Sequence, residues 1–479
     1  MRRGQGYILF AFLLVTSTIW SCSDDDSFTL SSSKLLTLSV DTINMDTVFS
    51  TVPSSIKTFW IYNKSGDGIR CSSVRLIRGK QSGFRVNIDG IYLGESNGFQ
   101  TSEIEIRDGD SIRVFIELTS NRNGSEKPEV IEDQLSLTLE SGVEQHVTLQ
   151  AHSLDADIFD QLIISEDTVI STKRPLIINK GISIAENATL LITAGSTIYF
   201  HSGAGIDVYG TLLTEGTPDK NVCLRGDRID NMFDYLPYDL VSGQWKGIVF
   251  HDTSFDNHIM FTDIHSTMDG VVCDSSTVSM NKLTIENSTI HNCQGHGLLS
   301  TACKIILRNT QITNTLGDCL RIIGGDAEIQ HCTLAQFYPF DSARGASLSF
   351  KNQRNNPVSL RCYNTLITGY SEDVVLGNQE DENVAYDYFF DTSILRTPAV
   401  EDTDHFNAVI WEAPKDTTAA GEKHFVLVDA NTQHYDFHLA ESSSAIGKAN
   451  PTYALSYDRE GRNRDREAAC IGAYEYIKP

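Results

Sequence analysis

The middle of the chain repeats itself every 22 residues, and this repeat constrains the fold more than any other feature. Segment 283–290 (LTIENSTI) returns as 305–312 (IILRNTQI), and Gly295 returns as Gly317. Both segments carry β-branched residues at alternate positions, as strands do, and the period is too short for paired helices. Each unit can bury its apolar face only against its neighbours. The repeat therefore predicts the coils of a parallel β-helix.

The same register predicts which side chains stack from coil to coil. Two inward columns are expected, one of Ile285, Leu307, Ile329 and Cys362 and one of Ile290, Ile312, Leu334 and Ile367. A third column contains Asn287, Asn309 and Asn364, which predicts a ladder of hydrogen-bonded asparagines within a turn.

The N-terminus indicates the cellular compartment. Arg2 and Arg3 precede an apolar stretch too short to remain as a membrane span. Residues 1–21 resemble a bacterial lipoprotein signal peptide, which makes Cys22 the lipidated first residue of the mature chain. The acidic run 24–26 resembles the export signal of Bacteroidota-type surface lipoproteins, and 22–33 reads as an acidic, serine-rich tether. The resemblance implies an outer-membrane protein that is exposed at the cell surface and touches the membrane only through its lipid anchor.

Charge and cysteine content narrow the possible functions. The chain has 63 acidic and 38 basic residues and a net charge of -25, which excludes nucleic acid as a partner. The chain has ten cysteines, of which nine remain when Cys22 is set aside. The 22-residue alignment places no two of these nine in one column of adjacent coils. Free buried thiols are therefore expected rather than a disulfide framework. No cysteine or histidine motif of a zinc site occurs, so neither a metal nor a cofactor is predicted.

Two or more domains are expected in a chain of this length. Residues 34–155 alternate apolar and polar side chains in short runs such as 57–62 and 111–116, separated by turn signals. This spacing predicts a small antiparallel β-sandwich of immunoglobulin type. Residues 160–479 continue as the β-helix, with loop insertions near 227–243, 335–357 and 377–425.

The β-helical part also resembles a known family. Segments 203–212 (GAGIDVYGTL) and 244–250 (QWKGIVF) resemble right-handed parallel β-helices, whose pectate-lyase-like members act on or bind polysaccharides. The tail 458–475 resembles the closing segment of such helices. The complete layout is similar to bacterial surface lipoproteins with a sandwich before the helix. The predicted fold is all-β, an N-terminal antiparallel β-sandwich plus a right-handed parallel β-helix.

One group of residues has the chemistry of a hydrolase. Asp269, His296 and Asp318 share a column of the alignment, with Arg321 nearby, and adjacent coils lie about 4.8 Å apart. A carboxylate–imidazole–carboxylate row can serve acid–base hydrolysis. Segments 268–271 (MDGV) and 295–298 (GHGL) resemble fragments of the polygalacturonase motifs. The paired-aspartate coil expected between them is missing, however, and no lysine follows Arg321. The alternative is that turns select Asp, His and Gly for their backbone geometry.

A second group of residues could bind a ligand. Phe233, Tyr235 and Tyr238 lie among acidic residues in the 232–239 segment (MFDYLPYD). Aromatic faces stack on sugar rings and carboxylates accept hydroxyl hydrogens, so this loop could be a glycan platform. The alternative is that the aromatic rings pack over the flank of the helix.

These features favour a non-catalytic glycan-binding, adhesion or envelope-accessory module. A polysaccharide lyase or glycosidase on the same scaffold is one alternative. The other is a scaffold subunit of an outer-membrane transport or assembly complex. The expected partner is accordingly a polysaccharide or an outer-membrane protein complex.

Overall fold

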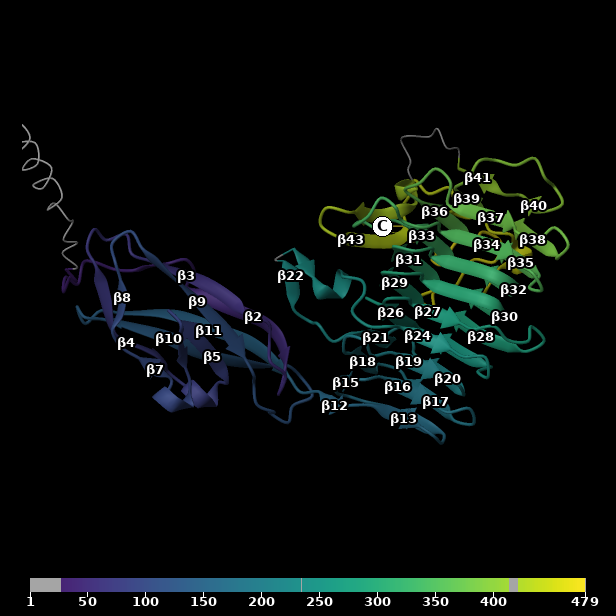
Figure 1. The fold of residues 1–479 in the computed structure, drawn as a ribbon. Coiled ribbons are helices and arrows are strands. Elements are labelled where there is room, and N and C mark those ends of the chain that lie inside the picture. Colours follow the sequence, from purple (N-terminus) through teal and green to yellow (C-terminus); the bar gives the residue numbers. More distant parts are fainter. Residues whose placement is uncertain (1–26, 234, 413–420, 479) are drawn as a thin grey trace, which may run out of the picture. The chain divides into compact units, whose positions relative to one another are not determined.

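The computed structural model describes residues 27–233, 235–412 and 421–478, and the chain divides into two units between Leu154 and Asp155 (Figure 1). The predicted signal peptide and Cys22 lie outside the described residues. The described part contains strands and short 3-10 turns but no α-helix, which confirms the all-β prediction. None of its helical turns has the length and apolar character needed to cross a bilayer.

The first unit is a β-sandwich, as predicted. One sheet has the strand order β1-β3-β9-β5-β6, and the other has the order β2-β11-β10-β4-β7 with β8 beside β4. Neighbouring strands are antiparallel except β2 and β11, which pair in parallel. Phe59, Ile61 and Val114, which alternate with exposed residues, lie in the core between the sheets. The elements are β1 (Thr37–Leu38), β2 (Thr42–Phe49), β3 (Lys57–Tyr62), β4 (Ile69–Leu76), η1 (Gly79–Gln81), β5 (Phe84–Ile88), β6 (Ile91–Leu93), η2 (Glu95–Asn97), β7 (Gln100–Thr101), β8 (Ile104–Ile106), β9 (Ser111–Leu118), β10 (Glu129–Leu139) and β11 (Glu144–Leu154).

The second unit is a parallel β-helix whose coils are built on three faces. Face A is a separate sheet, whereas faces B and C belong to one sheet that continues around a corner. Face A contains β12 (Asp157–Phe159), β15 (Leu176–Ile178), β18 (Thr197–Phe200), β21 (Val222–Gly226), β26 (Thr262–His265), β29 (Thr289–Cys293), β31 (Gln311–Thr315), β33 (Thr333–Gln336), β36 (Leu366–Gly369), β39 (Ile394–Leu395) and β41 (Ile410–Trp411).

Faces B and C follow face A along each coil. Face B contains β13 (Leu162–Ile164), β16 (Ile182–Ile184), β19 (Ile206–Val208), β24 (Ile248–Phe250), β27 (Val271–Cys273), β34 (Leu348–Asn352) and β37 (Val375–Gln379). Face C contains β14 (Thr168–Ile170), β17 (Thr189–Thr193), β20 (Thr211–Glu215), β25 (Asn257–Met260), β28 (Asn281–Glu286), β35 (Val358–Tyr363), β38 (Tyr386–Asp391) and β40 (Phe406–Asn407). Two long strands, β30 (Leu298–Arg308) and β32 (Leu320–Gln330), run through the B–C corner without a loop.

The remaining elements lie outside the coils. A hairpin of β22 (Asn231–Phe233) and β23 (Leu236–Pro237), followed by η3 (Tyr238–Leu240), is inserted between β21 and β24. After β41 come η4 (Glu422–His424), a hairpin of β42 (Phe425–Asp429) and β43 (His434–Leu439), and η5 (Pro451–Tyr453).

Pairing between coils confirms the register expected from the repeat. Ile285 pairs with Leu307, Leu307 with Ile329, and Ile329 with Cys362 on face C. The second column continues on face A from Ile290 through to Ile367. All these side chains are fully buried in one continuous core.

The cysteines also agree with the prediction. All nine cysteines of the described residues are free thiols, and all of them except the partly exposed Cys223 are buried. Burial raises the pKa of the Cys293, Cys319, Cys332 and Cys362 thiols to about 12, so the protonated form dominates. They pack as small apolar side chains.

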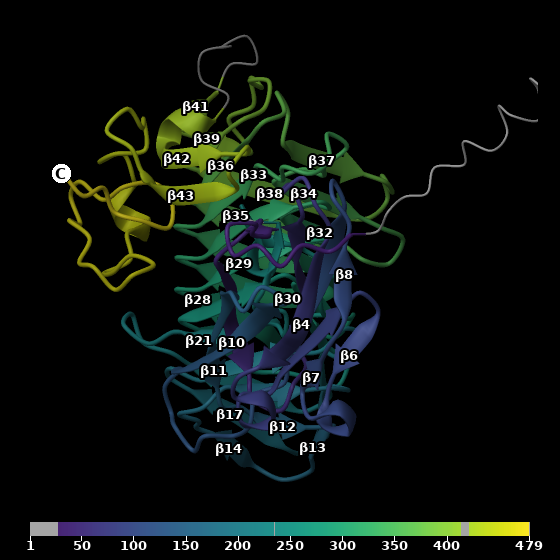
Figure 2. The ribbon, with the colours of Figure 1, turned by 90° about the vertical axis from the view of Figure 1, so that its left-hand side faces the viewer.

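The asparagine column is present but its partners differ from those expected. Asn287, Asn309 and Asn364 adopt positive φ angles of 50°, 45° and 49° in the turn from face C to face A. Their Nδ2 groups donate to the backbone carbonyls of Asp458, Tyr457 and Asn450. The amides therefore bind the C-terminal segment rather than one another. Figure 2 shows that segment (yellow) along one side of the stacked coils.

Arg464 fixes this C-terminal segment to the turns. Its fully buried guanidinium donates to Asn309 Oδ1 at 2.9 Å and to the Gly472 carbonyl at 2.9 Å, and it forms an ion pair with Glu475. Arg459 similarly donates to Thr289 Oγ1 at 3.0 Å. The closing segment therefore supplies the hydrogen-bond partners that the outer edge of the turns requires.

His331 occupies the same turn column, with φ 49°, but carries a buried imidazole in place of an amide. Its Nε2 lies 3.1 Å from Asn364 Nδ2, and its Nδ1 has no partner. Burial, together with the Arg464 cation, holds the pKa of His331 well below its ordinary value.

Substitution of His331 by asparagine should make the stability less sensitive to acid. In the parent protein the pKa of His331 is lower in the folded state than its unfolded value of about 6.5, so the unfolded chain takes up the extra proton in acid. As the pH falls below about 6.5, the free energy of unfolding therefore decreases by up to about 1.4 kcal/mol per pH unit. Asparagine tolerates the positive φ and has no titratable group. Urea unfolding of both proteins at about pH 8 and about pH 5 measures the effect. An identical loss on acidification in both proteins would contradict this account.

Candidate functional site

Asp269, His296 and Asp318 lie on successive coils in the turns that lead into β27, β30 and β32. Each one accepts a hydrogen bond from the backbone of the next coil. His296 N donates to Asp269 Oδ1 at 2.7 Å, and Asp318 N donates to His296 Nδ1 at 2.9 Å. Ala346 N donates to Asp318 Oδ1 at 2.7 Å. These side chains thus satisfy backbone groups along the turns.

This bonding restricts what His296 can do chemically. Because Nδ1 accepts from a backbone N–H, the proton of the neutral ring resides on Nε2. The Nδ1 atom lies 3.9 Å from Asp318 Oδ2, beyond hydrogen-bond reach. In this arrangement His296 can donate a hydrogen bond to a ligand, but it lacks the free lone pair of a general base.

Asp318 and Arg321 border a hollow of about 300 Å³. Arg321 Nη1 lies 3.4 Å from Asp318 Oδ2, and Ser349 Oγ donates to the same oxygen at 2.6 Å. Lys351 and Glu380 face each other across an ion pair of 2.7 Å in the same lining. His296 and Asp269 do not contribute to this lining. The hollow therefore contains two of the four residues expected to act together.

The aromatic loop divides into an exposed pair and a packed ring. Phe233 and Tyr235 are 55% and 59% exposed and stack on each other with ring centres 5.7 Å apart. Tyr238 instead packs under the Arg228 guanidinium at 3.9 Å. The three aromatic residues therefore do not form one platform, but the stacked pair presents an open apolar face to solvent.

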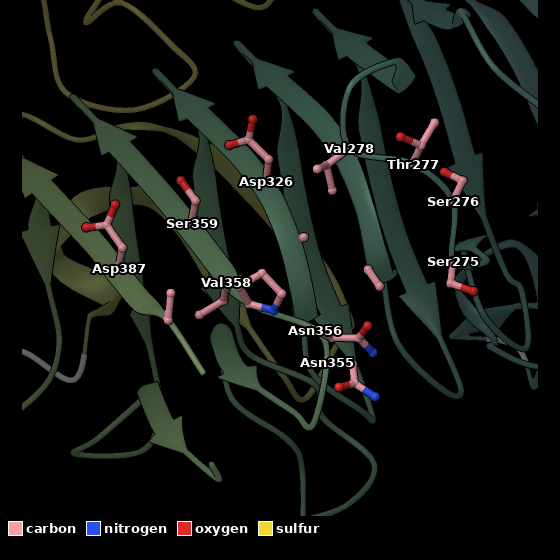
Figure 3. A pocket seen from close by; sticks show the side chains of 14 residues that line it. Ser275, Ser276, Thr277, Val278, Asp326, Asn355, Asn356, Val358, Ser359 and Asp387 are labelled. Atoms are coloured by element: carbon pink, nitrogen blue, oxygen red, sulfur yellow. The ribbon is translucent and has the colours of Figure 1, made fainter. Parts of the chain in front are cut away.

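A hollow larger than the one beside Asp318 lies elsewhere, at the corner between faces B and C. A groove of about 720 Å³ has Ala302, Gly325 and Ala385 in its lining (Figure 3). Gly325 has φ 93°, and a Cβ there would lie 2.3 Å from the Cys303 carbonyl oxygen, so only glycine fits this position. Small residues at the corner keep the groove open.

Differences in coil length build the walls of this groove. Strands β30 and β32 pass the corner without a loop, whereas loops interrupt the corner between β27 and β28 and between β34 and β35. The first loop contributes Ser275, Ser276 and Thr277, and the second contributes Asn355 and Asn356. The sequence reasoning missed this site. The contrast between uninterrupted and interrupted coils was the signal that could have revealed it.

Polar side chains converge on the groove. Asp326, Ser359 and Asp387 are paired in register on β32, β35 and β38, and Figure 3 shows them in one row. Lys304 lies 3.6 Å from Asp326, and Arg361 forms an ion pair with Asp387. The Oγ atom of Ser276 is buried in the loop wall and has no hydrogen-bond partner. A ligand with hydroxyl groups would satisfy such a site.

A second missed group lies on the outer side of face A. Asp263 and His265 are two residues apart on β26, and His291 pairs with His265 from β29. Asp263 Oδ1 lies 2.9 Å from His265 Nδ1 and 3.1 Å from His291 Nε2. Burial opposes ionisation of Asp263, but His291 and His265 hold the pKa of that carboxyl well below its ordinary value. For His265, burial opposes the charged form by lowering the pKa, but the neighbouring Asp263 and Asp239 carboxylates raise that pKa to about 9.

Comparison with known proteins supports the fold. The family profile described as "Right handed beta helix region" matches residues 164–334. The β-helical part is therefore a right-handed parallel β-helix. No match is found among curated proteins.

Three solved structures are similar over parts of the chain. A protein of unknown function from Porphyromonas gingivalis W83 shares 14% identity over 25% of this chain and 46% of its own, with a TM-score of 0.19. A family 123 glycoside hydrolase from Clostridium perfringens shares 8% sequence identity over 25% of this chain and 26% of its own, with a TM-score of 0.18. The Dettilon tailspike protein shares 13% sequence identity over 54% of this chain and 62% of its own, with a TM-score of 0.26. The match spans less than two thirds of each structure, and TM-scores this low carry no functional argument.

Replacing Asp318 by alanine should destabilise the β-helix, because the buried Ala346 N–H and the Ser349 hydroxyl lose their acceptor. An unsatisfied buried donor costs about 1–3 kcal/mol, and Asp318 is only 7% exposed. Denaturant unfolding measures the loss. Asp318→Asn keeps an oxygen acceptor and should lose less. Equal stability of Asp318→Ala and the parent protein would show that this row has no structural role.

Proposed function

We propose that this protein is a non-catalytic glycan-binding protein, held at the bacterial cell surface by a lipid on Cys22, and that the groove at the B–C corner is its glycan site. The observation that carries this proposal is the groove itself, a cavity of about 720 Å³ with small residues in its floor and polar groups along its sides. Ligand sites are typically concave, preformed cavities of this size.

The geometry of the groove suits an extended chain of sugar units. Asp326, Ser359 and Asp387 recur at the strand spacing of about 4.8 Å, which is close to the length of one sugar unit. Carboxylate and hydroxyl groups at this interval can accept and donate hydrogen bonds to successive units. The loop residues Ser275, Thr277, Asn355 and Asn356 add polar groups to the walls.

Charge indicates a neutral glycan. The whole chain carries a net charge of -25, and two carboxylates lie in the groove. The nearby cations Lys304 and Arg361 are each engaged in an ion pair with one of those carboxylates. A polyanionic polysaccharide would be repelled here, whereas hydroxyl groups of a neutral sugar would be bound.

Binding without catalysis is favoured over hydrolysis or elimination. The acid–base row of Asp269, His296 and Asp318 uses its acceptor atoms on backbone groups. In the groove the carboxylates of Asp326 and Asp387 lie two strands apart, and each already forms an ion pair with a neighbouring cation. Neither location offers the free base together with a second reacting group that glycan cleavage needs.

Asp326→Ala and Asp387→Ala should each weaken glycan binding about 10-fold, since loss of one hydrogen bond to a ligand costs roughly 1–1.5 kcal/mol. A glycan array identifies the ligand, and calorimetry with that glycan measures the affinity. Asp219→Ala makes the same charge change at an exposed turn far along the coils and should bind like the parent. Reducing-end release is measured in parallel and should stay at background. Parental affinity in both groove variants, or release of reducing ends, would refute the proposal.

The anchoring part of the proposal rests on the signal-like segment 1–21 and on Cys22. Cys22→Ala should move the protein from the detergent phase to the soluble fraction, because one side chain carries the whole membrane attachment. Cys223→Ala, which removes a partly buried thiol of the β-helix, is the matched control and should stay membrane-bound. Antibody labelling of intact cells tests exposure. Labelling only after lysis would contradict the surface location.

A further inference from the structure

Asp263, His265 and His291 bring three metal-binding atoms together on the outer side of face A. One carboxylate oxygen and two imidazole nitrogens lie within 4.8 Å of one another. Asp263 and His265 share one side of β26 because they are two residues apart, and His291 joins them from the adjacent strand. The backbone register of two neighbouring coils therefore fixes all three ligands without any loop.

The contacts around the trio resemble the outer shell of a metal site. His265 directs its Nε2 to Asp239 Oδ1 at 2.8 Å, which leaves Nδ1 for the trio. Arg225 Nη1 holds the same Asp239 oxygen at 2.6 Å. The hydroxyl of Ser266 donates to the Asp239 carbonyl at 2.8 Å, which secures the inserted loop. A histidine ligand commonly donates its second ring N–H to a carboxylate in this way, because the bond fixes its tautomer and orientation.

The donor set selects the kind of ion. Two imidazoles and one carboxylate suit zinc and similar transition metals, whereas magnesium and calcium prefer oxygen ligands alone. Zinc bonds of about 2.0–2.2 Å fit inside a triangle with sides of 2.9 and 3.1 Å at Asp263 Oδ1. The stacked rings of His265 and His291 would each rotate slightly so that their lone pairs face the ion.

The surroundings leave room for a further ligand. Asp263 and His291 are 36% and 23% exposed at their side chains, so an ion can enter from solvent. His291 also lines a pocket of about 180 Å³ between the inserted loop and the C-terminal hairpin. Asn314 in that lining is 2% exposed, and its Oδ1 has no hydrogen-bond partner. A buried polar atom without a partner is uncommon in proteins, and this one belongs to a residue that lines the same pocket as His291.

We propose that Asp263, His265 and His291 bind a divalent transition-metal ion of the zinc type, with an open coordination position for water or a small polar ligand. Asp239 orients His265 as a positioning residue and does not touch the ion. The site is independent of the glycan groove, because the two lie on different faces of the coils. The sequence showed no zinc motif because its ligands are an Asp-x-His pair and a histidine 26 residues later, outside the 22-residue period.

Calorimetry on the full chain, stripped of metal with a chelator, tests the site with zinc chloride. One equivalent of zinc should bind, and magnesium and calcium chloride should give no specific heat. His291→Ala and Asp263→Asn should each weaken zinc binding at least 100-fold, and Asp239→Asn should weaken it about 10–100-fold. Zinc should also raise the thermal unfolding midpoint of the parent but not that of His291→Ala.

His251→Ala is the matched control. His251 also bridges two carboxylates, those of Asp207 and Asp274, but has no second histidine beside it. This variant should bind zinc like the parent. Thermal unfolding in chelator checks that each variant is folded, and Asp263→Asn, which preserves side-chain shape, keeps the test valid if His291→Ala does not fold. Absence of stoichiometric zinc binding by the parent, or loss of binding in His251→Ala but not in Asp263→Asn, would overturn the proposal.

Discussion

The stacking of one coil on the next at the spacing of paired strands is the constraint on which the rest of the second unit depends. A single coil exposes its apolar side chains and its backbone N–H and C=O groups on both edges. Each coil therefore needs a neighbour in strict register, and that register brings like positions together in columns. The column of Ile285, Leu307, Ile329 and Cys362 forms part of the core in this way. The same rule aligns outward residues, such as Asp326, Ser359 and Asp387, at constant intervals.

Variation in coil length turns this regular stack into distinct surfaces. Where β30 and β32 pass the B–C corner without a loop, their neighbours project loops on either side, and a groove results. On face A, the insertion after β21 places Asp239 over a histidine from the next coil. Both sites thus arise where an irregular segment meets a regular column. The coils supply precise spacing, and the insertions supply walls and charge.

The C-terminal segment solves a problem that the turns create. Residues with positive φ bend the chain from face C to face A and leave polar groups at the outer edge. Asn287, Asn309 and Asn364 donate their side-chain amides to backbone carbonyls of that segment. Arg464, a buried residue of the segment itself, donates to the Gly472 carbonyl and so holds the segment in shape. A polar group left without a partner here would cost as much as a lost hydrogen bond. The resemblance of 458–475 to a closing segment has this physical basis.

Much of the architecture could be predicted from the sequence, because strand periodicity and repeat length are local properties. They determined which residues of the coils face inward, that the first unit is a sandwich, and that cysteines such as Cys362 remain free within the core. They also aligned Asp269, His296 and Asp318. The partners of these polar side chains depended on the three-dimensional fold. His296 Nδ1 accepts a hydrogen bond from a backbone N–H of the next coil, and Asn364 donates one to the Asn450 carbonyl. The groove and the Asp263–His265–His291 trio were decided in the same way by the tertiary structure, since coils of unequal length bring their residues together from outside the repeat.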